Sequence, residues 1–287
     1  MRVMRSCEYN DEYRMSNTEI QAYVERVRQD GFCVIDNVIP AAKCQPLHKH
    51  LLCVGNQLRR EEVYESMQVS AVKGLFSVDQ SVAQYLADDR VLAIVEGLLG
   101  KNIRISFTSL LTNEPGKERT NMHADWPFNQ NTVCHFPAPY PDRIAHTTAL
   151  LMISPFTDEN GGTLVVPGSH RRNTNPTDKQ SGFDPYAVYP DEIRITGPAG
   201  SLLLMDSRTW HCSPANRSDE ARVCVALRYA PWWLNLEALD PQSELRRQWV
   251  EEPGLTENDQ ARIPREAYER LPEKAKPLLR HWIQLSS

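Results

Sequence analysis

From residue 103 onward the chain consists of short apolar and β-branched runs separated by Pro, Gly and Asn, and this pattern limits the possible folds more than any other feature. Short strands divided by turn residues are typical of antiparallel sandwiches and barrels, because such strands can pair through brief connections. The runs that we interpret as strands are 103–112, 146–156, 162–170, 200–210 and 221–230. The sequence therefore predicts a mainly β core over about residues 101–235.

The residues before this core have a mainly helical pattern. Ser16 and Glu19 have the spacing of a helix-capping box, and the predicted helix that follows ends at Gly31. A β-rich stretch comes next, over 31–39. Further stretches with helical periodicity are 41–58, about 80–99 (from Ser81 to Gly100) and, after the core, 264–283.

The length of the chain predicts one domain over residues 1–287, since β-barrel domains commonly reach this size without dividing. We expect a mostly helical N-terminal part (1–100), the β core (101–235) and a helical C-terminal tail (236–287). Two long stretches, 127–145 and 171–191, are rich in Pro and Asn and lack periodicity. Loops of this length in a compact domain are typical of lids or substrate-binding walls.

Composition argues against several classes of protein. The formal net charge is -5 and the basic residues are scattered, so a nucleic-acid partner is not expected. The seven cysteines form no Cys-x-x-Cys pair, which favours reduced thiols in a cytoplasmic protein. No apolar run approaches the roughly 18 residues of a membrane span, and the N-terminus lacks the apolar segment of a secretion signal.

His123 and Asp125 are two residues apart, so in an extended segment their side chains point to the same side and can bind one metal ion. Alone, such a pair is more often a surface feature than a metal site. His211 provides a third ligand after the apolar run 200–205, and Arg222 follows at the start of another β-rich run. Two histidines and a carboxylate can hold Fe(II) and leave positions open, and a guanidinium binds the carboxylate of a cosubstrate.

These residues and their neighbours resemble the phytanoyl-CoA dioxygenase family of Fe(II)/2-oxoglutarate-dependent oxygenases over about residues 18–235. The similar stretches are Gly31-Phe32-Cys33-Val34-Ile35, His123-Ala124-Asp125, 160–170 (NGGTLVVPGSH) and 211–216 (HCSPAN) followed by Arg222. The resemblance implies a double-stranded β-helix, that is, a jelly-roll or cupin-like core with flanking helices. It also implies a reaction that couples decarboxylation of 2-oxoglutarate, with release of succinate and CO2, to oxidation of an organic substrate.

By this resemblance His123, Asp125 and His211 are the iron ligands and Arg222 binds 2-oxoglutarate. Iron(II), 2-oxoglutarate and O2 are the implied cofactor and cosubstrates, and ascorbate is expected to support activity. The carboxylate at Asp125 disfavours a halogenase, because similar halogenases have a small residue at this position.

Other residues are weaker candidates. Ser213 and Thr112 match positions where the family often places further cosubstrate contacts. Arg217 competes with Arg222 for the cosubstrate but lies in a turn, where we interpret it as a surface residue. Among the remaining histidines, His170 is expected to make a structural hydrogen bond, whereas His135 and His146 are expected at the surface.

The substrate and two other function classes stay open. We expect a small-molecule metabolite that is hydroxylated, although desaturation, cyclisation and epoxidation are alternatives. The predicted walls, 61–75, 127–145 and 171–191, contain both aromatic and basic residues, so an anionic or an apolar substrate would fit. A catalytically inactive jelly-roll binding protein and a cupin-type metal isomerase or hydrolase are the alternative functions. The oligomeric state is not predicted.

Overall fold

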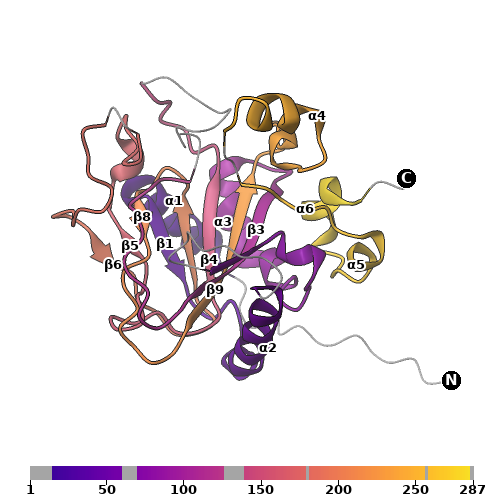
Figure 1. Cartoon of the computed structure of the whole chain (residues 1–287), viewed down its shortest axis with the longest axis horizontal. Coiled ribbons are helices and arrows are strands. Elements are labelled where there is room, and N and C mark those ends of the chain that lie inside the picture. Colours follow the sequence, from indigo (N-terminus) through magenta and orange to yellow (C-terminus); the bar gives the residue numbers. More distant parts are fainter. Residues whose placement is uncertain (1–14, 60–69, 126–138, 179–180, 256–257, 285–287) are drawn as a thin grey trace.

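The computed structural model describes residues 15–59, 70–125, 139–178, 181–255 and 258–284. Three helices precede most of the sheet and three short ones follow it (Figure 1). None of the helices in the described residues is long and apolar enough to cross a membrane. The helices are α1 (Asn17–Asp30), α2 (Ala41–Arg59), α3 (Asp89–Leu99), α4 (Glu244–Arg246), α5 (Arg265–Glu269) and α6 (Lys276–Leu279).

Two antiparallel sheets form the jelly-roll core that the sequence predicts. The large sheet has the strand order β1-β7-β4-β9-β3-β2, and the small sheet has the order β6-β5-β8. All of the pairings are antiparallel, and several join strands that are far apart in the chain. The strands are β1 (Phe32–Ile35), β2 (Ser70–Lys73), β3 (Arg104–Asn113), β4 (Thr147–Met152), β5 (Leu164–Val165), β6 (Ile193–Arg194), β7 (Leu202–Asp206), β8 (His211–Cys212) and β9 (Arg222–Ala230).

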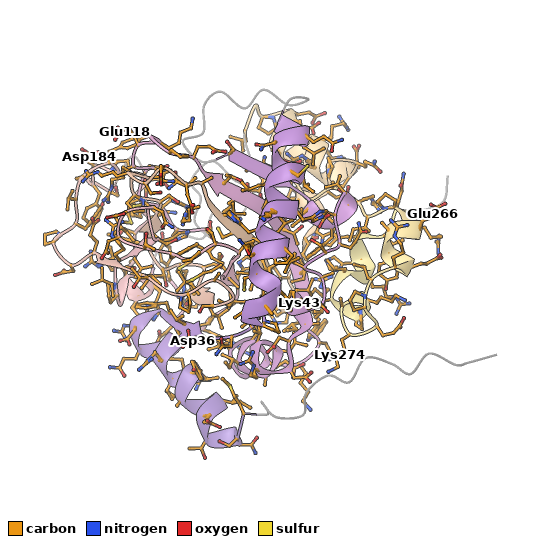
Figure 2. The ribbon with its side chains drawn as sticks, turned by 90° about the horizontal axis from the view of Figure 1, so that it is seen from below. Asp36, Lys43, Glu118, Asp184, Glu266 and Lys274 are labelled. Carbon is orange, nitrogen blue, oxygen red and sulfur yellow. The ribbon has the colours of Figure 1, made fainter. Side chains whose placement is uncertain are left out.

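Each face of the large sheet packs against a different layer. One face joins residues of α1, α2 and α3 in the largest apolar cluster, which also takes in Leu279 and Trp282 of the C-terminal tail. The other face turns toward the small sheet, where a second cluster includes Met152, Val165 and Met205. Figure 2 shows α2, with Lys43 near its start, lying across the sheet. Helices therefore cover one face of the large sheet and leave the other for the interior of the jelly roll.

The predicted capping box at the start of α1 is confirmed. The Ser16 hydroxyl accepts a hydrogen bond from the Glu19 N–H, and the Glu19 carboxylate accepts one from the Ser16 N–H. Gly31 ends the helix at φ 92°, a backbone conformation that glycine adopts without steric cost. Strand β1 follows directly and pairs with β7, which places the end of α1 beside the chain leading to His211.

The stretch 80–99 is less helical than predicted. Tyr85–Ala87 form a single 3-10 turn, and α3 begins only at Asp89, because the Asp88 carboxylate caps it by accepting hydrogen bonds from the N–H groups of Arg90 and Val91. The predicted strand over 162–170 is also shorter than expected, since it ends before a turn at Gly168, where φ is 73°.

The C-terminal tail bonds to the outer edge of β3. The side-chain carbonyl of Gln260 accepts a hydrogen bond of 2.7 Å from the Thr108 N–H. The carbonyl of Ile105 accepts a 2.7 Å bond from the Trp282 indole and lies 2.8 Å from Nε2 of His281. These contacts lie where β2 no longer pairs with β3, so tail side chains complete part of the strand edge.

Candidate active site

His123 and His211 form a backbone pair at the margin of the small sheet. The N–H of His123 donates to the His211 carbonyl at 3.0 Å, and the N–H of His211 donates to the His123 carbonyl at 2.9 Å. Residues directly opposite in an antiparallel pair project to the same face, and here the two ring centroids are 4.3 Å apart. The pairing therefore brings together two side chains that are far apart in the chain.

Backbone carbonyls orient both imidazole rings. Nδ1 of His123 lies 3.0 Å from the Asn121 carbonyl, and Nδ1 of His211 lies 2.9 Å from the Thr209 carbonyl. A carbonyl can only accept, so each Nδ1 carries the proton and each Nε2 keeps its lone pair. These Nε2 atoms lie 3.7 and 3.6 Å from the carboxylate of Asp125. One ligand atom from each of the three residues lies within 4.8 Å of the others.

Asp125 is held by groups from the large sheet. Its N–H donates to the Ser207 carbonyl at 2.8 Å, and the Thr148 hydroxyl donates to Oδ2 at 2.8 Å. Arg228 forms an ion pair with Oδ1. Thr148 and Arg228 are directly opposite each other in the β4–β9 register, so two neighbouring strands support the two carboxylate oxygens.

The protonation states suit a metal site. Burial raises the pKa of Asp125, but the charges of Arg228 and the two histidines outweigh it and hold that pKa well below its usual range. Burial, together with the neighbouring His211, lowers the pKa of His123 to about 4 against the opposing effect of Asp125. A carboxylate and neutral imidazole are the forms that bind a divalent metal. The donor set of two imidazoles and one carboxylate fits Fe(II).

His146 lies behind Asp125, in the interior. We expected it at the surface, and this was wrong: the residue is 4% exposed, and its ring nitrogens each lie 2.7 Å from a hydroxyl, of Ser106 and Ser207. The Ser207 hydroxyl in turn lies 2.9 Å from that of Thr148. Burial and the charge of Arg228 lower the pKa of His146 to about 3. A chain of hydroxyl and imidazole groups thus supports the carboxylate from behind.

Arg222 is a buried cation at the start of β9. Its two terminal nitrogens donate to the hydroxyls of Thr163 at 3.2 Å and Ser213 at 2.9 Å, and its guanidinium stacks over Phe156. Its Nε is buried without a hydrogen-bond partner, and no carboxylate in the described parts of the chain pairs with it. Burial lowers the pKa of this guanidinium, because a buried charge without a counter-ion is costly. The free acid group of a dicarboxylate such as 2-oxoglutarate fits this environment.

The structure brings Ser213 to Arg222 but not Thr112. In β3 the residue opposite Arg222 is Asn113, whereas Thr112 is opposite Val223, a residue of the helix-side cluster. Neighbouring strand residues point to opposite faces, so Thr112 faces the helices rather than the interior. The cosubstrate role of Thr112 stays a prediction without support from this geometry.

Arg228 is the site residue that sequence reasoning missed. A signal for it was present, because Arg222 and Arg228 are six residues apart in one strand, and an even separation places both on the same face. The strand register that aligns Arg228 with Thr148 was not visible in the sequence.

Pro185 of the loop 171–191 and Glu192, just after this loop, lie beside the segment that leads to His123. Arg119 donates two hydrogen bonds to the Glu192 carboxylate, and the Met122 N–H donates to the Pro185 carbonyl at 2.7 Å. Glu118 and Asp184 lie at the same margin of the molecule in Figure 2. The proposed wall 127–145 falls mostly outside the described residues, as does His135.

His170 makes the structural hydrogen bond that was expected of it. Its Nε2 lies 3.0 Å from the Arg28 carbonyl, near the end of α1. Arg217, as expected, is exposed, in a turn whose N–H donates to the Glu159 carbonyl.

A jelly roll that presents two histidines and one carboxylate beside a buried arginine defines a non-haem Fe(II)- and 2-oxoglutarate-dependent dioxygenase. The chain belongs to the phytanoyl-CoA dioxygenase (PhyH) family, whose profile matches residues 27–224. Iron and 2-oxoglutarate are the cofactor and cosubstrate of this family.

Relatives and solved structures agree with this membership. The uncharacterised protein Rv1501 of Mycobacterium tuberculosis is 23% identical over 216 residues, which cover 73% of this chain and 75% of the relative. The dioxygenase ALT11 of Alternaria alternata is 24% identical over 242 residues, covering 78% and 76%. The crystal structure of the epimerase SnoN in complex with Fe3+, alpha ketoglutarate and nogalamycin RO superposes with a TM-score of 0.57 at 20% identity. That superposition covers 75% of this chain and 85% of SnoN, and it shows a shared fold.

Proposed function

We propose that this dioxygenase hydroxylates a small-molecule metabolite, with iron held by His123, Asp125 and His211 and with 2-oxoglutarate held by Arg222 and Ser213. One observation carries the proposal: the two Nε2 atoms and the Asp125 carboxylate face one another at 3.6 and 3.7 Å, each oriented by its own hydrogen bonds. Three ligands on one side of an ion leave its other positions open.

The chain's own groups hold and orient the reactants. When bound, Fe(II) with 2-oxoglutarate supplies dioxygen activation, coupled to loss of CO2 and formation of succinate. Nδ1 of each histidine keeps its proton and donates a hydrogen bond to a backbone carbonyl, which holds each ring toward the metal position. Arg222, fixed by Thr163 and Ser213, would pair with the far carboxylate and so set the direction in which the cosubstrate lies.

A small molecule is the substrate class that the comparisons favour. SnoN is an epimerase whose crystal structure contains nogalamycin RO, so an oxygenase of this fold is not restricted to hydroxylation. Hydroxylation is the simplest proposal for this chain.

Succinate formation tests the proposal. The full-length protein with Fe(II), 2-oxoglutarate and ascorbate should form succinate, and formation should increase with a substrate from a metabolite library. His123→Ala and Asp125→Ala should abolish it, while Arg217→Ala, which changes an exposed arginine, serves as the control. Full turnover in the His123 variant would overturn the assignment of the ligands.

The two alternatives predict different outcomes. A jelly-roll binding protein would form no succinate and consume no oxygen under any of these conditions. A metal isomerase or hydrolase would act without 2-oxoglutarate, and Arg222→Ala would leave it active.

A further inference from the structure

Arg228 lies beside the metal ligands but is not one of them, and its one role so far is to hold Oδ1 of Asp125. Its guanidinium pairs with Oδ1 of Asp125 and stacks over Phe107, with its central carbon 4.8 Å from the ring centroid. Its side chain is 15% exposed, so it is mostly buried but still accessible to solvent.

Among the described residues, the charges around the metal position leave Arg228 without a counter-ion of its own once iron is bound. A divalent ion takes one negative charge from Asp125 and a second from the near carboxylate of 2-oxoglutarate. The far carboxylate of 2-oxoglutarate is matched by Arg222. No other carboxylate of the described residues lies within 4.0 Å of the Arg228 guanidinium.

Residues 126–138 (WPFNQNTVCHFPA), which follow Asp125 in the sequence, contain no Asp or Glu. Within the described residues, only one terminal nitrogen of Arg228 donates to another side chain, and Nε is buried without a partner. A buried or half-buried guanidinium that lacks its anion is costly, so a ligand that brings one gains affinity.

We infer that Arg228 binds an acidic group of the organic substrate, next to the metal. This inference rests on the proposed function, since the charge balance assumes bound iron and 2-oxoglutarate. A planar guanidinium favours a carboxylate. Because the guanidinium contacts a metal ligand, the acidic group must lie close to the carbon that is oxidised. The substrate class is therefore a carboxylic acid oxidised near its carboxyl end, rather than a purely apolar compound.

Binding of matched probes tests this inference without turnover. The probes are monocarboxylic acids of increasing size, from acetate to 3-phenylpropanoate, each compared with its primary amide. Calorimetry with the full-length protein, loaded with Ni(II) and 2-oxoglutarate, gives the two affinities. A hydrogen-bonded ion pair of this kind should make the best acid bind about tenfold or more tightly than its amide.

Variants then assign the preference to one residue. Arg228→Met, which removes the charge at similar length, should lose the preference for acids, whereas Arg228→Lys should retain part of it. Arg26→Met, which changes an exposed arginine of α1 outside the predicted walls, should retain all of it. Arg228→Met can also weaken metal binding, because Arg228 holds Asp125. This loss affects the acid and its amide alike, so the ratio of their two affinities within one variant is independent of it.

Equal affinity for acids and amides in the wild-type protein, or an unchanged preference in Arg228→Met, would overturn the inference and leave Arg228 as a positioning residue for Asp125. The proposed function would survive either result if succinate formation still depended on His123. If no succinate forms under any condition, the proposed function itself fails.

Discussion

Thr148 and Arg228, directly opposite each other on β4 and β9, each bond a different oxygen of Asp125. With both oxygens bonded, the carboxylate has one orientation relative to His123 and His211. The large sheet therefore positions one ligand, and the small sheet, through its backbone pair, positions the other two.

Removing the Thr148 hydroxyl should weaken metal binding without removing a ligand. Thr148→Val deletes the 2.8 Å bond to Asp125, and loss of such an outer bond typically lowers metal affinity or activity about 10- to 100-fold. Competition with a chelator measures the affinity for Fe(II).

Thr147→Val is the matched control on the adjacent residue. The Thr147 hydroxyl is buried without a hydrogen-bond partner in the described residues, so its removal should leave metal affinity unchanged and unfolding stability equal or higher. Equal metal affinities of the Thr148 and Thr147 variants would contradict the role assigned to Thr148.

Arg222 should govern the requirement for 2-oxoglutarate. Arg222→Ala removes the buried charge and the bonds to Thr163 and Ser213, so the KM for 2-oxoglutarate should rise by about two orders of magnitude, as for loss of a charge-assisted bond. Arg222→Lys keeps the charge without the planar fork and should give a smaller rise. Arg217→Ala should leave the KM unchanged, and a comparable rise there would show that the wrong arginine was assigned.

A side chain at Gly31 should disturb the chain that carries His211. A Cβ at Gly31 would lie 2.6 Å from Oγ1 of Thr209 and 2.7 Å from Nδ1 of His170. The Thr209 hydroxyl bonds the Gly31 carbonyl, and the Thr209 carbonyl orients the His211 ring. Gly31→Ala should therefore lower both the thermal midpoint and the metal affinity.

Gly116→Ala separates backbone strain from this clash. Gly116 also has a positive φ, of 74°, but a Cβ there would meet nothing within 4 Å. Its variant should lose about 1 kcal/mol of stability or slightly more from the strained backbone and keep its metal affinity. If both glycine variants keep normal metal affinity, the contacts from Gly31 through Thr209 to His211 do not affect metal binding.

His146 should make the protein less stable in acid. Its pKa is about 3 in the folded chain, against about 6.5 when unfolded, so between these values the unfolded chain binds a proton that the folded chain does not. Stability should therefore fall as the pH falls through this window, by up to about 1.4 kcal/mol per pH unit for this group.

The check is denaturant unfolding from pH 6 to pH 4 in the presence of a chelator. His146→Asn should reduce the slope of the unfolding free energy against pH by the contribution of about one bound proton, up to about 1.4 kcal/mol per pH unit. A residual slope is expected, because the pKa values of His123 and His281 are also lowered, to about 4. An unchanged slope would mean that His146 does not titrate in this window.

The parts of the site that the sequence predicts are those with local or family-specific patterns. The spacing of His123 and Asp125 follows from the geometry of an extended chain, and the capping box and Gly31 follow from helix ends. His211 and Arg222 needed the resemblance to a family, because no local rule connects residues so far apart.

The remaining parts depend on strand register, which is set by distant partners. Arg228 became recognisable only when β9 was seen to pair with β4, and Thr112 turned out to face the helices because β3 pairs with β9 in this register. His146 looked like a loop histidine, yet pairing of β4 with β7 and β9 buries it. Strand β6, with two residues, was too short for any periodicity to reveal.

The side chains of Gln260, His281 and Trp282 occupy hydrogen-bonding positions on β3 that another polypeptide strand would otherwise use. A shortened chain that ends before Gln260 would present this edge, together with the apolar residues that Trp282 covers, to other copies of itself. A protein fused at the C-terminal end should therefore be attached beyond Gln284, so that these contacts are kept. A fusion that displaces them should self-associate through the edge of β3, whether or not the active site is intact.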